Sequence, residues 1–232
     1  MKLIICDIDG CLTKGKNHKL NLVDILKIRT FIENSDDVFT LCTGRSQPYV
    51  ELFCQLLNIS TPCICENGSY LYDPATDLVI PHANLDNEYF KVLNTIKEQV
   101  VPDILDNINY RYESGKDASL SINSSCSVEK IYFLLRDIIS HYNLNITHSC
   151  SAVDITAKKI DKGEGLENLL HYVSFRPKKI IGIGDSMGDM PFLIKSDIIS
   201  SPQNADKKIK SISHYVSEHS YSSAVLDILE RL

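Results

Sequence analysis

Two carboxylates follow a short apolar run at the start of the chain. Asp7 and Asp9 come directly after residues 3–6, and Gly10 follows them. Ligands of open α/β sheets bind beyond the carboxyl ends of the strands, so this position suits a reactive site. One carboxylate there can act as a nucleophile and the other as a proton donor, or both can help to hold a hard cation. The same pattern is also typical of a plain solvated turn.

A second pair of acids lies in the last quarter of the chain. Asp185 and Asp189, at positions i and i+4, come just after the apolar residues 180–183. If both apolar runs are strands of one sheet, four carboxylates converge, and a divalent cation would relieve their repulsion. Oxygen ligands without histidine favour Mg²⁺. The alternative is that these acids only cap a helix N-terminus.

Two further segments could hold an anion. Thr43, Gly44 and Arg45 follow the apolar residues 38–42, where a hydroxyl, a glycine and a helix start can together cradle a phosphate. Lys162 opens a later predicted helix, and its ammonium could offset the charge of a phosphoryl group and of an attacking carboxylate. Taken alone, the first segment is also an ordinary helix start and Lys162 an ordinary surface lysine.

Strands and helices alternate in the first and last thirds of the chain and would position these residues. Asn21 and Ser46 stand before helical patterns as N-caps, and Pro48 suits a first helical turn. Short apolar runs predict strands at residues 2–6, 38–42, 63–65, 179–183 and 197–200. This alternation predicts an α/β fold.

Residues 81–156 have a different organisation. A helical stripe over residues 89–100 precedes two strand-like segments, and a helix after Ser127 precedes two more. The order helix-strand-strand, occurring twice, predicts a small α+β module with an antiparallel sheet and helices on one side. We therefore expect a core domain from residues 1–80 and 157–232, interrupted by an inserted domain of residues 81–156.

The composition limits the classes of function. The 232 residues include 30 Asp and Glu against 24 Lys and Arg, a formal net charge of −6, which argues against broad binding of nucleic acids or anionic membranes. The apolar run at the start is far too short for a membrane span, so we expect a cytoplasmic protein. The eight cysteines include no CxxC pair, so we expect reduced, buried thiols rather than a zinc site.

The four segments, in their order along the chain, resemble the haloacid dehalogenase superfamily of aspartate-dependent phosphohydrolases. The resemblance covers essentially the whole chain and implies a Rossmann-like core with a parallel sheet. The inserted module resembles the αββαββ (type C2B) cap of the Cof-type subclass IIB. Its short length makes the chain most similar to archaeal-type phosphoglycolate phosphatases. Sucrose-phosphate phosphatases, mannosyl-3-phosphoglycerate phosphatases and phosphomannomutases share this architecture, and a phosphate- or metal-binding protein without activity is a further alternative.

The resemblance also implies roles for the motif residues. Asp7 would attack phosphorus and become an aspartyl-phosphate, and Asp9 would protonate the leaving alcohol and then activate water. Mg²⁺ would be positioned by Asp7, the backbone carbonyl of Asp9, Asp185 and Asp189. The phosphate and substrate would be held by Thr43, Gly44, Arg45 and Lys162. The substrate would be a small phosphomonoester, and the protein a monomer or homodimer.

Substrate choice would be set by the cap, where Arg111 and Lys116 are candidate contacts for a second anionic group. The alternative is a solvated hairpin loop. Two positions depart from the pattern of the superfamily. Cys11 stands where Thr is common, beside the nucleophile, and Gly188 stands where Asn is frequent in the fourth motif.

Overall fold

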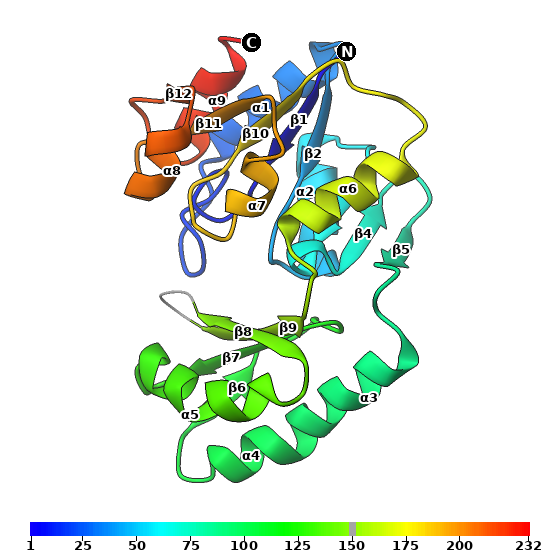
Figure 1. Cartoon of the computed structure of the whole chain (residues 1–232). Coiled ribbons are helices and arrows are strands. Elements are labelled where there is room, and N and C mark those ends of the chain that lie inside the picture. The colour runs from blue at the N-terminus through cyan, green and yellow to red at the C-terminus, as the bar shows by residue number, and fades with distance from the viewer. Residues whose placement is uncertain (149–151) are drawn as a thin grey trace. The chain divides into compact units, whose positions relative to one another are not determined.

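The computed structural model describes residues 1–148 and 152–232 (Figure 1). The chain divides into two compact units, Met1–Ile80 with Asp161–Leu232 as the first and Pro81–Ile160 as the second. The second division falls after Ile160 rather than after residue 156. The reason is that strand β9 (Val153–Ala157) continues to Ala157, which pairs with Leu144 inside the second unit.

A parallel five-stranded sheet forms the centre of the first unit, in the order β12-β11-β10-β1-β2. Its strands are β1 (Leu3–Cys6), β2 (Val38–Leu41), β10 (Ile180–Ile183), β11 (Ile198–Ser201) and β12 (Tyr215–Val216). In the register of the sheet, Cys6 lies opposite Leu41 on one side and Ile183 on the other. The chain segments after these three residues therefore leave the sheet side by side. The predicted α/β core is confirmed.

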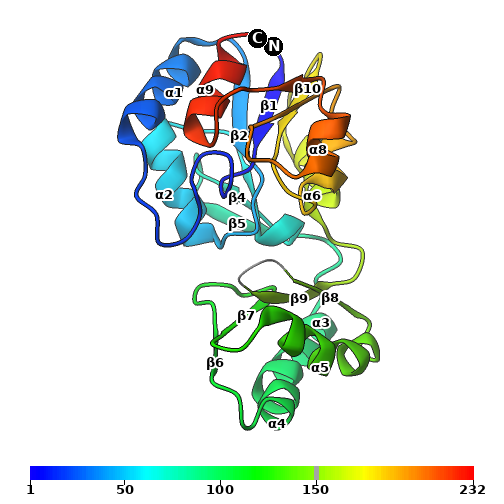
Figure 2. The same cartoon turned by 90° about the vertical axis from the view of Figure 1, so that its left-hand side faces the viewer.

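Helices cover both faces of this sheet (Figure 2). Ile4 and Cys6 belong to one apolar cluster and Leu3 and Ile5 to another, as expected for a strand buried on both faces. The first face carries α1 (Leu22–Asn34), α2 (Gln47–Leu57) and α9 (Ser222–Leu229), and the second carries α6 (Lys162–Tyr172), α7 (Met190–Leu193) and α8 (Lys207–Ile212).

Local signals fix where the helices of the first unit begin. Asn21 caps α1 by accepting a hydrogen bond from the backbone of Asp24, as predicted. Ser46 occupies the N-cap position of α2, but its side chain makes no capping bond; Pro48 in the first turn supplies the start signal instead.

A small antiparallel sheet extends the first unit beyond β2. Its strands are β3 (Cys63–Cys65), β4 (Tyr70–Asp73) and β5 (Leu78–Pro81). Cys42, directly after β2, forms a parallel bridge with Ile64 of β3. This bridge connects the small antiparallel sheet to the segment after β2, which carries the second motif.

The second unit has the predicted order of helix-strand-strand, repeated once. Its helical segments are α3 (Asn87–Thr95), η2 (Ile96–Val100), α4 (Val101–Ile104) and α5 (Val128–Ser140). Its antiparallel sheet, in the order β6-β7-β9-β8, contains β6 (Tyr110–Tyr112), β7 (Leu120–Ser124), β8 (Leu144–His148) and β9. Leu120 and Ile122 of β7 pack with Leu93 and Leu135 of the helices. The intervening Ser121 therefore points to the other face of the sheet.

No helix among residues 1–148 and 152–232 is long and apolar enough to cross a membrane. Six of the cysteines in this part of the chain are buried free thiols, and Cys126 is a half-buried one. Cys150 lies outside the described residues.

Candidate active site

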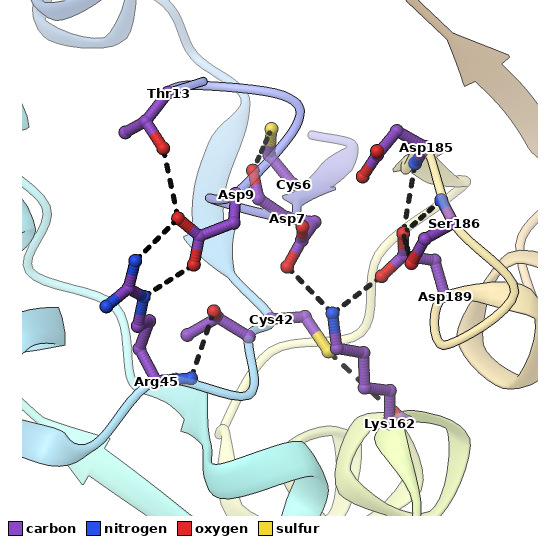
Figure 3. A network of polar contacts seen from close by, with 11 residues as sticks. Cys6, Asp7, Asp9, Thr13, Cys42, Arg45, Lys162, Asp185, Ser186 and Asp189 are labelled. Atoms are coloured by element: carbon purple, nitrogen blue, oxygen red, sulfur yellow. Dashed lines mark hydrogen bonds and ion pairs between the residues drawn. The ribbon is translucent and has the colours of Figure 1, made fainter. Parts of the chain in front are cut away.

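The carboxyl edge of the main sheet brings the first, second and fourth motifs together. The backbone amide of Asp7 donates to the carbonyl of Ile183 at 3.0 Å, and that of Cys42 donates to the carbonyl of Cys6 at 2.9 Å. These two bonds continue the sheet by one residue on each side of β1. Asp7, Thr43 and Asp185 therefore follow three adjacent strands. Figure 3 shows the side chains of Asp7 and Asp185 at this edge of the sheet.

Lys162 lies at the centre of this edge. It opens α6, whose N-cap residue Asp161 accepts hydrogen bonds from the backbone amides of Gly163 and Glu164. The ammonium of Lys162 donates to Asp7 Oδ1 at 2.7 Å and to Asp189 Oδ1 at 2.6 Å (Figure 3). Its side chain is 6 % exposed. Burial opposes the charge, but the attraction of the two carboxylates outweighs it and raises the pKa of Lys162 well above its ordinary value.

Asp189 uses both of its oxygens inside the protein. Oδ1 accepts from Lys162, while Oδ2 accepts from the backbone amides of Asp185 and Ser186 at 3.0 and 2.9 Å and from the Ser186 hydroxyl at 3.1 Å. The side chain of Asp189 is fully buried. In this structure Asp189 therefore orients the loop that carries Asp185 and holds Lys162, and both of its oxygens are occupied at the position predicted for a metal ligand.

The carboxylates of Asp7 and Asp185 lie close together, beside the single ammonium of Lys162. With the thiol of Cys11, their ligand atoms lie within 4.8 Å of one another. Asp185 Oδ1 is buried without a hydrogen-bond partner in the described part of the chain. Burial, opposed by Lys162 and reinforced by Asp189, raises the pKa of Asp7 to about 7. Burial and the charges of Asp7 and Asp189 raise the pKa of Asp185 to about 8.

These two carboxylates fit a hard divalent cation. An ion such as Mg²⁺ takes carboxylate oxygens and would satisfy the unpaired atom of Asp185 while relieving the repulsion between the acids. Space at the site depends on Gly10, which adopts φ +97° and lies against Asp185. A Cβ atom at Gly10 would come within 2.1 Å of Asp185 Oδ2. Any other residue at position 10 would displace the carboxylate.

Asp9 lies in a different environment, although it is only two residues from Asp7. Arg45 donates to its two oxygens at 2.5 and 2.9 Å, and the hydroxyl of Thr13 donates at 3.1 Å (Figure 3). Arg45 also stacks on the ring of Tyr49, 4.4 Å from its centroid. Burial opposes ionisation of Asp9, but the hydrogen bonds and charge of Arg45 prevail and lower its pKa.

The second motif forms a fixed loop beside Asp9. The buried Thr43 accepts a bond from the Arg45 amide on its hydroxyl and one from the Asn67 amide on its carbonyl. A Cβ atom at Gly44 would lie 2.9 Å from the side chain of Asn67, so Gly44 permits this close approach. The segment 66–68 thus supports the predicted phosphate loop, a contact that motif spacing alone does not reveal.

Comparison with known proteins identifies the family. Residues 4–130 and 100–229 match the family described as haloacid dehalogenase-like hydrolase. The chain belongs to this family. Phosphoglycolate phosphatases of Methanosarcina acetivorans and Methanosarcina mazei are 26 % and 24 % identical to it, and each match covers 100 % of this chain and 96 % of the relative.

Solved structures show the same fold. A protein from Thermoplasma acidophilum superposes with a TM-score of 0.79 at 23 % identity, covering 100 % of this chain and 97 % of that one. A subclass IIB sugar phosphatase of the haloacid dehalogenase superfamily superposes with a TM-score of 0.70 at 17 % identity, covering 100 % and 98 %. The predicted family, fold class and enzyme class, a haloacid dehalogenase-type phosphatase, are confirmed.

The candidate contacts in the second unit differ from each other. Arg111 on β6 is exposed, as a substrate contact would be. Lys116 is not: its side chain is only 6 % exposed, and its ammonium donates to Ser121 Oγ at 2.5 Å. Glu113 and Asp154 lie 3.7 and 3.6 Å from the same ammonium. In this haloacid dehalogenase-family chain, Lys116 is thus held inside the second unit.

Sequence reasoning assigned no role to several residues that shape the site. Tyr49 under Arg45, Asn67 beside Gly44 and Ser186 on Asp189 all act through contacts between loops. Tyr49 lies four residues after Arg45, a spacing that places both on one side of a helix start, and this signal could have been used. The pairing of Asp9 with Arg45 had no comparable signal.

Proposed function

We propose that this chain is a Mg²⁺-dependent phosphatase that hydrolyses a small phosphomonoester through an aspartyl-phosphate on Asp7. The observation that carries the proposal is the position of Asp7. Its carboxylate is buried, fixed by Lys162 at 2.7 Å, and faces a second carboxylate, Asp185, that has an unpaired oxygen. A nucleophile, an ammonium and a second carboxylate that could bind a metal ion thus lie in one place.

The reaction requires an anion to attack an anion. An oxygen of Asp7 would bond to phosphorus as the ester oxygen leaves with a proton, and water would then release phosphate and restore the carboxylate. Lys162 would lower the repulsion, and Thr43 and the Gly44 amide would bind phosphate oxygens. Bound Mg²⁺, held by Asp7 and Asp185, would supply further charge neutralisation. Enzymes lower such barriers by about 8–23 kcal/mol or more, which no single group provides.

Asp9 would move the protons of both steps. Arg45 and Thr13 favour its ionised form, which suits the base that activates water in the second step. To protonate the leaving alcohol in the first step, Asp9 must first gain a proton, so its contact with Arg45 must weaken when substrate is bound. Arg45 would thereby set the proton affinity of Asp9 during the cycle.

We propose phosphoglycolate as the first substrate to test, because the two Methanosarcina relatives carry that activity in their names. Sugar phosphates are the second class, because a sugar phosphatase shares the fold over the whole chain. The second unit would select between them. The acidic composition suits a cytoplasmic enzyme, acting as a monomer or homodimer.

The proposal is tested by phosphate release from a generic aryl phosphate with Mg²⁺. Asp7→Asn should lower the rate by at least about a thousandfold, because an amide is not a nucleophile, and excess chelator should abolish turnover reversibly. Asp73→Asn is the matched control, since Asp73 is a buried aspartate at the end of β4, where it accepts a bond from Tyr172. Undiminished release by Asp7→Asn, or in chelator, would refute the proposal.

A further inference from the structure

Cys11 places a sulfur atom beside the proposed Mg²⁺ site, although Mg²⁺ prefers oxygen ligands. Its thiol is fully buried and lies within 4.8 Å of the ligand oxygens of both Asp7 and Asp185. Within residues 1–148 and 152–232, this is the one group of acidic, cysteine or histidine side chains close enough together to share a metal ion. Cys11 also belongs to the apolar cluster on the first face of the sheet, so its thiol lies where that cluster meets the two carboxylates.

The turn after β1 fixes this position of Cys11. The amide of Gly10 donates to the carbonyl of Thr13 at 2.7 Å, and the amide of Cys11 donates to the carbonyl of Ile8 at 3.3 Å. The side-chain amide of Asn204 donates to the carbonyl of Gly10 at 2.9 Å, and Gly10 itself lies against Asp185. These bonds fix the backbone position from which the Cys11 side chain reaches the two carboxylates.

Two carboxylates and a thiolate form a mixed donor set. Zn²⁺ binds sulfur at about 2.3 Å and carboxylate oxygen at about 2.0–2.2 Å in a tetrahedron that has room for water as a fourth ligand. Thiolate ligands select soft ions such as Zn²⁺ over Mg²⁺.

We propose that Asp7, Cys11 and Asp185 form a soft-metal site, which takes Zn²⁺ or Cd²⁺ in competition with Mg²⁺. On binding, the metal forms a bond to sulfur and the thiol proton goes to solvent. A Zn²⁺-loaded site then carries one negative charge more than a Mg²⁺-loaded site with a protonated thiol. Phosphate binding weakens accordingly, so Zn²⁺ inhibits; this consequence rests on the proposed phosphatase function.

The test is a Cd²⁺ titration of the metal-free protein, followed by thiolate-to-metal absorbance in the ultraviolet and by calorimetric competition with Zn²⁺. The variants are Cys11→Ser and the matched control Cys126→Ser, which removes a half-buried cysteine of the second unit. Wild type and Cys126→Ser should bind one Cd²⁺ per chain with the absorbance band. Cys11→Ser should lose the band and bind Zn²⁺ at least about tenfold more weakly, since even the loss of an outer-shell partner costs that much.

An unchanged band or an unchanged Zn²⁺ affinity in Cys11→Ser would overturn the inference. If that variant does not fold, Asp185→Asn replaces it: loss of the band supports the site, and persistence of the band overturns it. Mg²⁺-dependent phosphate release is measured separately on wild type. If phosphate is released but no Cys11-dependent absorbance band appears, only this inference is refuted. If the band appears but no phosphate is released, the soft-metal site is supported and the proposed phosphatase function is refuted.

Discussion

Each unit of the molecule contains a buried lysine among carboxylates, and the two centres are instructive to compare. Lys162 in the first unit and Lys116 in the second both have side chains that are 6 % exposed. Lys162 contacts carboxylates at 2.6 and 2.7 Å, whereas Lys116 lies 3.6 and 3.7 Å from Asp154 and Glu113. Burial of a charged pair therefore does not by itself mark a reactive centre.

The centres differ in how the chain assembles them and in what they leave unpaired. Lys162 joins Asp7, 155 residues away, to the loop after β10, whereas Lys116 contacts Ser121 and Glu113 within its own hairpin and Asp154 of the same small sheet. Around Lys162 a further carboxylate, Asp185, keeps an unpaired buried oxygen. Around Lys116 the carboxylates are one-fifth exposed and solvated. Only the first centre has a surplus of buried negative charge for a cation and a phosphoryl group to use.

The largest difference between the two centres is expected when each lysine is replaced by methionine and the loss of stability and of activity is measured. Lys162→Met leaves Asp7 and Asp189 buried without their cation, and removing one partner of a buried pair costs about 3–5 kcal/mol. Lys116→Met should cost less, about 1 kcal/mol, because the side chains of Glu113 and Asp154 are one-fifth exposed and water can hydrate them when the ammonium is gone. Urea unfolding at pH 7 measures both, and aryl phosphatase activity should disappear only in Lys162→Met. Equal destabilisation would contradict the contrast drawn here.

The surplus charge of the first centre should appear as a pH dependence of stability. The pKa values of Asp7 and Asp185 are raised to about 7 and about 8, so the folded protein binds more protons than the unfolded chain between about pH 4 and 8. The free energy of unfolding of the metal-free protein should therefore fall as pH rises through that window, by several kcal/mol.

Two controls accompany this measurement. Asp185→Asn should flatten the slope, because it removes one of the two groups, and Mg²⁺ at pH 8 should restore stability by binding the folded state. A metal-free wild type that becomes more stable from pH 5 to 8 would show that the two acids are not the source of surplus charge.

Much of this site could be predicted because strand ends are easy to read. Apolar runs of four or five residues located β1, β2 and β10, and parallel pairing makes their carboxyl ends meet. That is sufficient to bring Asp7 and Asp185 together. The repeated helix-strand-strand order of the second unit was equally readable from its periodicity.

The rest depended on contacts between loops, which spacing does not encode. Three features arise from side chains that different loops or strands bring into contact. They are the pairing of Arg45 with Asp9, the occupation of both oxygens of Asp189 and the burial of Lys116. Lys116 shows the difficulty best. Its hairpin suggested a solvated cation, yet Ser121 and Asp154, neighbours across β7 and β9, draw its ammonium inward.

Arg45→Gln should have a smaller effect than either change above. Without the guanidinium, the carboxylate of Asp9 loses its two hydrogen bonds and its counter-charge, so its pKa rises toward the ordinary value or above. We expect kcat to fall by about ten- to a hundredfold, with the acidic limb of the pH–rate profile moving to higher pH. Arg45→Lys should recover part of the charge but not the two-point geometry. A pH profile that is unchanged in Arg45→Gln would mean that this pair does not control the proton on Asp9.

The smallest effect is expected from replacing Arg111, an exposed residue of the second unit. Arg111→Ala removes an exposed cation, so the interaction with a substrate carboxylate that we propose for it would contribute no more than about 1 kcal/mol. The KM for phosphoglycolate should rise a few-fold while kcat stays constant, and the KM for an aryl phosphate monoester, which has no carboxylate, should not change. Salt should reduce the difference, because exposed charges are screened. Equal KM changes for both substrates would assign Arg111 to the stability of β6, and the second unit would then recognise its ligand through other residues.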